Sequence, residues 1–253
     1  YYQKKVVTLP YNLKNVIMRL LKVTTAIALL TLFACHTTST EVPSETTQLT
    51  QYVNPFIGTD GTGNTYPGAT TPFGMVQLSP DIGIPGWDRI SGYFYPDSII
   101  TGFSHTHLSG TGAGDLYDIL IMPTNSKFNK RIEANNYKPF SYFQHGTETA
   151  TAGYYRVQLE SYNIGVELTA TPRVGVQRYT FPQDNQSDIT IDLGYTINWD
   201  KPTATYLKVV DDTTIEGYRY STGWARDQKV YFVAKLSKPF ANYTDRKSTR
   251  LNS

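Results

Sequence analysis

The chain has 253 residues, which is enough for one large domain or two smaller ones with an ample core. It contains 20 tyrosines, 11 phenylalanines and 3 tryptophans but only 17% charged residues, a composition typical of a β-rich globular protein. The formal net charge is +2, yet residues 1–35 and 246–253 hold eight of the 23 basic residues and none of the 21 acidic ones. Residues 36–245 therefore carry 15 basic and 21 acidic residues, a net charge of −6, which argues against nucleic-acid binding.

The N-terminal part predicts an export signal. Met18 begins the sequence MRLLKVTTAIALLTLFAC, in which a short basic region precedes an apolar run over residues 23–34 and then Cys35. The run is too short to span a bilayer comfortably and has the proportions of a signal-peptide core. Its end, LFAC, resembles a bacterial lipobox, which predicts lipidation at Cys35 and a lipid anchor in the bacterial envelope, periplasmic or at the cell surface. The alternatives are a plain secretory signal or a buried apolar strand.

These features divide the chain into five segments. Residues 36–50 are rich in Thr, Ser, Glu and Pro and predict an extended tether, whereas the body that follows is compact. The last octamer, RKSTRLNS, breaks with the preceding pattern, and we expect the natural protein to continue past Asp245. The expected order is upstream translated sequence (1–17), lipoprotein signal peptide (18–35), tether (36–50), a truncated β-sandwich domain (51–245) and a non-native tail (246–253).

The second half of the body reads as a series of short strands. Each segment is bounded by Gly, Pro, Asn or Asp, and most alternate apolar and polar residues with β-branched and aromatic side chains. Antiparallel sheets with one solvated face produce this pattern, so we predict an all-β fold, an antiparallel β-sandwich. The expected strands are Tyr154–Glu160, Ile164–Thr171, Val174–Phe181, Asp188–Leu193, Thr213–Tyr220 and Lys229–Leu236, and Leu116–Met122 is also strand-like.

The stretch from Gly86 to Gly114 predicts a constrained loop region with a function. It holds Trp87 and two of the four histidines among many Gly, Ser and Thr residues, without a sustained period of 3.6 or 2. An indole face against the C–H face of a sugar, with Asp88 accepting from hydroxyls, is one interpretation of Trp87. The other is that Trp87 fills the core, as large aromatic residues usually do.

The histidines and carboxylates of this half leave further alternatives open. His105 and His107 are two residues apart and would point the same way from an extended segment, so with Asp115 they could ligate a metal. They could equally hydrogen-bond within a polar loop and orient a ligand or their neighbours. One acid and one base would suffice for glycoside hydrolysis, but most Asp residues act in turns and caps. The candidates are Asp60, Asp88, Asp97, Asp115 and Asp118.

Several motifs, in order over residues 51–240, resemble glycoside hydrolase family 92. The most specific is GFSHTHLSGTG, and the others are VNPFIGT, YPGA, PFGMVQLSP, GYY, LTAT, RYTF and GWARDQ. The resemblance implies an exo-acting, calcium-dependent, inverting α-mannosidase. Such enzymes are exported by Bacteroides-like bacteria to degrade N-glycans and yeast mannan, which agrees with the predicted export signal.

The resemblance also implies how the site is divided. Family members have a galactose-mutarotase-like β-sandwich (a supersandwich) followed by an (α/α)₆ barrel, which supplies the catalytic acid and base and most of the Ca²⁺ shell. This chain ends before that barrel, so we expect no catalytic residue in it and no activity of the fragment alone, and its own metal ligands stay unknown. Trp87 matches a tryptophan that contacts substrate beside the scissile bond. Asp88, His105 and His107 are added as expected substrate-binding residues.

One departure bears on specificity. Many family members have histidines at the positions of Thr62 and Asn64, where this chain reads DGTGN, so an α-1,2 linkage preference is only the default. The expected partners are mannose-containing glycans and a membrane reached through the lipid on Cys35, with no nucleic acid. Two other hypotheses are a freestanding, non-catalytic sugar-binding envelope lipoprotein and a structural envelope β domain without a ligand.

Overall fold

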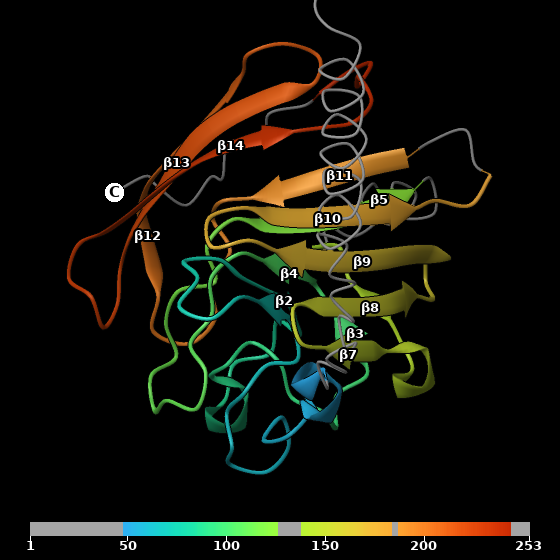
Figure 1. The fold of residues 1–253 in the computed structure, drawn as a ribbon. Coiled ribbons are helices and arrows are strands. Elements are labelled where there is room, and N and C mark those ends of the chain that lie inside the picture. The colour runs from blue at the N-terminus through green and yellow to red at the C-terminus, as the bar shows by residue number, and fades with distance from the viewer. Residues whose placement is uncertain (1–47, 126–137, 184–186, 244–253) are drawn as a thin grey trace, which may run out of the picture. The chain divides into compact units, whose positions relative to one another are not determined.

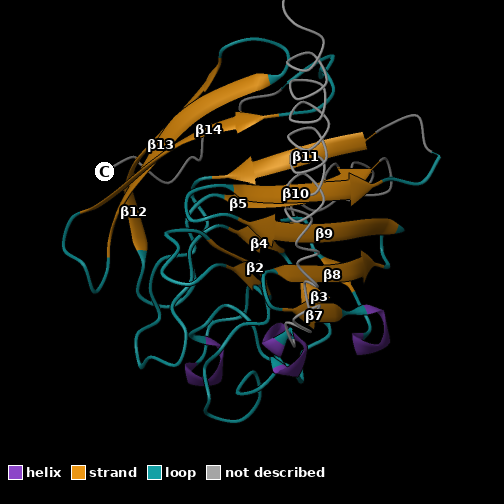
Figure 2. Cartoon of the chain, in the orientation of Figure 1, coloured by secondary structure: helices purple, strands orange, loops and turns teal. Residues whose placement is uncertain are grey.

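The computed structural model describes residues 48–125, 138–183 and 187–243. These residues form fourteen β-strands, arranged in four sheets, and three 3₁₀ helices (Figures 1 and 2). The helices are η1 (Leu49–Tyr52), η2 (Trp87–Arg89) and η3 (His145–Thr147). Every strand pairing in the described part of the chain is antiparallel, which confirms the predicted all-β class.

A five-stranded sheet forms one layer, in the order β1-β2-β4-β5-β11. Its central strand, β4, has three residues and pairs with β5 through Phe103 and Ile121. A two-stranded ribbon, β3 (Ile99–Ile100) with β6 (Ser141–Tyr142), accompanies it. The five strands are β1 (Ala69–Thr70), β2 (Gln77–Asp81), β4 (Gly102–Ser104), β5 (Leu120–Asn125) and β11 (Ser187–Asp192).

A four-stranded sheet, in the order β10-β9-β8-β7, packs against the first to make a sandwich (Figure 1). Alternate residues of β8 and β9 are buried, as expected for strands with one solvated face. Their inward side chains join Leu78, Phe103 and Met122 of the first sheet in a single apolar cluster. The four strands are β7 (Thr149–Thr151), β8 (Tyr154–Leu159), β9 (Ile164–Ala170) and β10 (Gly175–Thr180).

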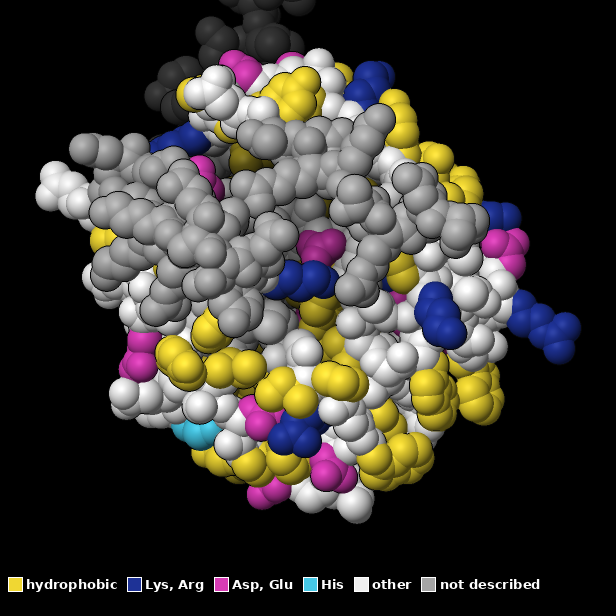
Figure 3. All heavy atoms as spheres, turned by 180° about the vertical axis from the view of Figure 1, so that it is seen from behind, with side chains coloured by type: hydrophobic (Ala, Val, Ile, Leu, Met, Phe, Trp, Pro, Cys, Tyr) yellow, Lys and Arg dark blue, Asp and Glu magenta, His cyan; other side chains and the backbone are white. Residues whose placement is uncertain are grey.

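A three-stranded sheet follows, made of β12 (Lys201–Val209), β13 (Thr214–Thr222) and β14 (Gln228–Lys235). One face of β13 is buried through alternate residues that include Arg219. The other face carries stacked tyrosines, with the rings of Tyr218 and Tyr220 4.5 Å apart. Figure 3 shows hydrophobic side chains at the surface on the side of the molecule where these strands lie.

The periodicity-based predictions locate most of these strands. The six segments predicted between residues 154 and 236 correspond to β8, β9, β10, β11, β13 and β14 with ends within two residues. The strand predicted from Leu116 is wrong at its start: β5 begins at Leu120, because Leu116, Tyr117 and Ile119 have positive φ angles that a strand does not accept. β12 was missed, since Pro202 and interspersed Lys and Thr residues weaken its alternation.

The stretch 86–114 is mostly irregular, as predicted, with η2, β3 and β4 as its short regular elements. The proposed upstream sequence, the signal peptide with Cys35, most of the tether (36–47) and the tail (246–253) lie outside the described residues. Within the described ranges, no helix combines the length and apolar character that crossing a membrane requires.

An ion pair on the solvated face of the four-stranded sheet leads to a prediction about how stability depends on pH. Arg178 donates to both carboxylate oxygens of its cross-strand neighbour Glu167, at 2.7 and 2.6 Å, and the Tyr154 hydroxyl donates to the same group at 2.7 Å. Arg178, followed by Tyr154, lowers the pKa of Glu167 from 4.5 to about 2. A depressed carboxyl pKa stabilises the fold above the ordinary value, and this stabilisation is lost as the pH falls from 4.5 towards 2.

We expect Arg178→Ala to raise the pKa of Glu167 towards 4.5, because the larger of its two partners is removed. Carboxyl-carbon NMR shifts recorded against pH measure this pKa. The matched control is Arg156→Ala, which removes a nearby charge without a hydrogen bond and should move it less. A pKa that stays near 2 in Arg178→Ala would assign the shift to Tyr154 instead.

Candidate functional site

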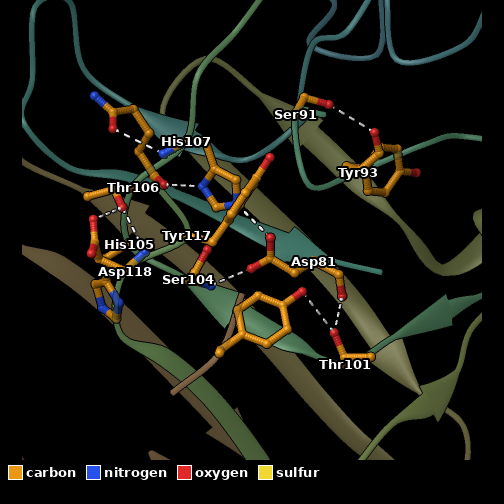
Figure 4. A network of polar contacts seen from close by, with 12 residues as sticks. Asp81, Ser91, Tyr93, Thr101, Ser104, His105, Thr106, His107, Tyr117 and Asp118 are labelled. Carbon is orange, nitrogen blue, oxygen red and sulfur yellow. Dashed lines mark hydrogen bonds and ion pairs between the residues drawn. The ribbon is translucent and has the colours of Figure 1, made fainter. Parts of the chain in front are cut away.

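The motif residues His105, Thr106 and His107 continue β4 into a loop that is held from both sides. The backbone N–H of His105 donates to Asp118 O at 2.9 Å, and that of Tyr117 donates to Thr106 O at 3.0 Å. The Thr106 hydroxyl donates to a carboxylate oxygen of Asp118 at 2.7 Å. Segments 105–107 and 117–118 are thus joined by backbone and side-chain bonds together, which fixes the loop in one geometry (Figure 4).

His107 is the centre of a buried polar network (Figure 4). Its Nδ1 lies 2.7 Å from Gln77 O, and its Nε2 lies 3.0 Å from Asp81 Oδ1 and 3.1 Å from Ser104 Oγ. The imidazole and the Asp81 carboxylate have no exposed surface. Gly92 closes the site from the other side: a Cβ there would lie 2.5 Å from Asp81 Oδ1, and its φ of +89° suits glycine.

The meeting of a serine, a histidine and an aspartate invites comparison with a nucleophilic triad. In a triad the serine and the aspartate contact opposite ring nitrogens, so that one accepts the proton and the other orients the ring. Here Ser104 and Asp81 both contact Nε2, while Nδ1 is occupied by Gln77 O. Ser104, His107 and Asp81 are also buried, so the contacts fit a network that positions the loop rather than a nucleophilic site.

His105 is held on the other side of the same loop. Its Nδ1 donates to Ile119 O at 2.8 Å, and the Gln177 side chain of β10 lies 3.3 Å from its Nε2. Burial lowers the pKa of His105, opposed by its bond to Ile119, so the ring is neutral at physiological pH. The structure therefore places His105 partly buried, beside Gln177 of β10, and His107 in a sealed pocket with no exposed imidazole surface.

A second buried network surrounds Arg219 of β13. Its guanidinium donates to Asp118 Oδ1 at 2.6 Å, to Tyr195 O at 2.9 Å and to Leu193 O at 3.1 Å, and it forms a close ion pair with Asp200. The side chains of Arg219, Asp118 and Asp200 are completely buried. Burial raises the pKa of Asp200, and the hydrogen bond from Arg219 opposes this. The cluster joins β13 to the histidine loop and to the segment before β12.

Trp87 and Asp88 lie at the surface, in contrast to the histidines. Trp87 opens η2 and is 57% exposed, so it does not fill the core. Arg89, the last residue of η2, forms a two-bond pair with Asp97 at 2.7 and 2.8 Å, and this anchors the helix. The indole approaches a second loop, since a Cβ at Gly112 would lie 3.4 Å from Trp87 Cη2. An exposed, anchored indole beside a half-buried carboxylate is suited to binding a sugar.

The remaining carboxylates of this half have structural partners. Asp60 accepts from the next backbone N–H at 2.6 Å, and Asp115 accepts from the N–H of Trp224 at 3.0 Å. Asp97 and Asp118 bind arginines, as described above. The contacts therefore support the turn, cap and ion-pair interpretation of these four residues over a glycosidase acid–base pair.

The alternative of a histidine–metal site is not supported. His105, His107 and Asp115 are each bound to different partners, and no group of three His, Cys, Asp or Glu side chains in the described ranges could hold a metal ion.

Three buried charged residues of the two networks were not predicted from the sequence. Asp81, Asp200 and Arg219 were not singled out, although Arg219 occupies an inward position of a predicted strand, a signal that could have marked it as buried and paired.

A family model for the glycosyl hydrolase family 92 N-terminal domain matches residues 52–252. The chain belongs to this family. A family 92 α-mannosidase from Bacteroides thetaiotaomicron, solved alone and with mannoimidazole, is 41% identical to it with a TM-score of 0.70, over 76% of this chain and 26% of that one. The family 92 glycosyl hydrolase ccman5 is 26% identical with a TM-score of 0.62, over 75% of this chain and 26% of that one.

A curated relative is also described as a glycosidase. An uncharacterised secreted glycosidase from Arthroderma benhamiae is 30% identical over 144 residues, which is 53% of this chain and 18% of that protein. The family 92 domain described here thus spans about a quarter or less of the length of its relatives. Its all-β sandwich is the N-terminal part of a glycosidase architecture.

The Arg219 network yields a stability prediction. Arg219→Met should lower the free energy of unfolding by about 3–5 kcal/mol, because it leaves Asp118 and Asp200 buried without their cation. Urea unfolding of the variant and the parent chain measures this difference.

The matched control is Lys208→Ala, which removes an exposed pair with Glu216 and should leave the free energy of unfolding almost unchanged. If Arg219→Met were no more destabilising than Lys208→Ala, the buried network would not hold the loops together. Arg219→Lys should recover only part of the loss, since an ammonium group lacks the planar fork that reaches all the acceptors.

Proposed function

We propose that this domain is the carbohydrate-binding, active-site-completing part of an inverting, calcium-dependent exo-α-mannosidase that acts on N-glycans or mannan, with α-1,2-linked mannose as the default substrate. The observation that carries the proposal is the 41% identity to an α-mannosidase that was solved with mannoimidazole. The exposed indole of Trp87 supports it, because a sugar ring presents a C–H face that packs on an aromatic plane.

Each part of the site has a separate task in this proposal. Trp87 binds the apolar face of a sugar beside the scissile bond, and Asp88 accepts from its hydroxyl groups. His105 and His107 act from beneath the surface as positioning residues, since their contacts fix the loop that carries Gly112. The domain therefore supplies one rigid wall of a binding site.

The acid and base are assigned to the part of the enzyme outside this domain. Inverting hydrolysis needs one carboxylic acid to protonate the leaving oxygen and one carboxylate to activate water, about 6.5–9.5 Å apart. Four of the five candidate carboxylates described above are already bound to arginines or backbone N–H groups. The Ca²⁺ ion would supply electrostatic binding of substrate hydroxyls, and we assign its main ligands to the same remaining part of the enzyme.

We also propose export and lipid anchoring at Cys35 to the bacterial envelope. The signal-like sequence from Met18 to Cys35 supports this, as does the description of the Arthroderma benhamiae relative as secreted. A labelled palmitate incorporated into the wild-type protein, but not into Cys35→Ser, would support the anchor.

Assigning the acid and base to the rest of the enzyme predicts that the domain by itself is inactive. The 253-residue chain should release no mannose from an aryl α-mannoside or from α-1,2-mannobiose, with or without Ca²⁺, because four of the five candidate carboxylates in its described residues are already bound. The full-length enzyme, meaning this domain with the rest of the polypeptide that solved family members contain, should hydrolyse both and lose activity in EGTA. Mannose release by the chain alone would contradict the assignment. Glycan binding without turnover by the full-length protein would favour the non-catalytic sugar-binding hypothesis.

Trp87 gives a second prediction. In the full-length enzyme, Trp87→Ala should lower kcat/KM for mannosides by about tenfold or more, since a sugar-binding face is lost, while Tm stays within about 2 °C. Trp87→Phe, which keeps a smaller aromatic face, should lose less. A variant that loses thermal stability in step with activity would show that Trp87 acts in folding rather than in substrate binding.

A further inference from the structure

All three tryptophans of this chain lie at the surface. Trp87, Trp199 and Trp224 are 57%, 45% and 75% exposed, whereas large aromatic residues such as Tyr93 and Tyr155 are fully buried. Leaving an indole in water forgoes a large gain from burial, so several exposed tryptophans on one domain indicate a surface that binds something. Trp199 and Trp224 have no role in the site as proposed above.

The three tryptophans converge on one short stretch of chain, residues 112–115. The N–H of Trp199 donates to Gly114 O at 3.0 Å, and the N–H of Trp224 donates to Asp115 Oδ2 at 3.0 Å. The ring of Trp87 packs beside Gly112, and the preceding N–H, of Gly86, donates to the side chain of Asn198 at 3.1 Å. Residues more than 100 positions apart in sequence are therefore brought to one place.

Close packing behind the tryptophans holds them there. Asp115 is 3% exposed, and a Cβ at Gly223 would lie 2.1 Å from its Oδ1. A Cβ at Gly114 would lie 2.6 Å from Asn198 Cβ, so the backbone at both glycines approaches its neighbours as closely as it can. The backbone that carries Trp199 and Trp224 is thus pre-formed, which lowers the entropic cost of binding.

The surroundings favour a carbohydrate over a protein partner. Trp199 follows the partly buried Asn198, and Trp224 is followed by Ala225, Arg226 and Asp227, whereas Asp200 beside Trp199 is buried against Arg219. Arg226 and Asp227 are exposed, and Asp88 is partly so. Aromatic planes separated by carboxylate and guanidinium groups match the alternating C–H faces and hydroxyls of a sugar chain, whereas a protein-docking surface has an apolar centre depleted of charges.

We propose that Trp199 and Trp224 extend the sugar-binding surface of Trp87 and contact sugar residues of the glycan beyond the one that Trp87 binds. The inference rests on the proposed function, which it deepens by assigning the recognition of longer glycans to these two side chains. Its consequence is a preference for oligosaccharides over single-sugar substrates, because only an extended glycan reaches all three indoles.

The test uses Trp199→Ala and Trp224→Ala in the full-length enzyme, with an aryl α-mannoside and an α-linked mannotetraose as paired substrates. We expect kcat/KM for the tetraose to fall by about tenfold in each variant, mainly through KM, and the value for the aryl mannoside to change by less than about twofold. Trp→Phe at the same positions should retain part of the preference. The matched control is Tyr231→Ala, which removes an exposed aromatic side chain of β14 whose ring contacts those of Tyr218 and Tyr220, and which should change kcat/KM for neither substrate.

The outcomes separate this inference from the proposed function. Equal losses on both substrates, or losses that follow a fall in Tm, would make the two tryptophans contacts with the rest of the enzyme and overturn the inference. No change on either substrate would also overturn it. If the wild type cleaved no mannoside, the proposed function would fail. In that case, retardation of the wild-type protein but not of the variants in mannan-containing gels would still support glycan contact by Trp199 and Trp224. If the variants were retarded as strongly as the wild type, the inference would be overturned.

Discussion

The buried ion-pair network of Arg219 is the interaction on which the arrangement of the loops depends. Taking a guanidinium and two carboxylates out of water costs several kcal/mol per ion, and this cost is offset only when every donor meets an acceptor. Arg219 reaches Asp118 in the loop between β4 and β5, and Asp200 and the carbonyls of Leu193 and Tyr195 in the loop between β11 and β12. Only one arrangement of those loops satisfies all these bonds, so the network selects it.

This network also meets the one around His107. Asp118 binds Arg219 on one side and Thr106 on the other, and Thr106 stands between the two histidines of the motif. The loops around the site have few ladder hydrogen bonds, so buried side chains provide the connections that a sheet would otherwise supply. Trp199 and Trp224 are attached to the loop between β4 and β5 through Gly114 and Asp115, and the ring of Trp87 packs beside Gly112 of the same loop. The buried polar contacts thus hold the backbone that carries the exposed tryptophans in place.

Local periodicity predicted the strands well where each strand has one wet and one dry face. β8 and β9 alternate buried and exposed residues along their length, and the predicted segments match them closely. The prediction failed at Leu116–Ile119, where positive φ angles interrupt an apolar run that reads as strand. It also failed at β12, whose outward-facing polar residues and Pro202 hide the pattern, because pairing with β13 rather than intrinsic propensity holds that strand in place.

The sequence by itself determined the all-β class, most strands of the second half and the family, and it singled out Trp87 as an unusual loop residue. Only the tertiary structure decided which polar residues are buried together, and it moved His107 from an expected substrate contact to the centre of a sealed network. The physical reason is the range of the interactions. Strand periodicity depends on neighbouring residues. The Asp118–Arg219 pair joins positions 101 apart and the Asp81–His107 pair joins positions 26 apart, and no local sequence pattern connects such positions.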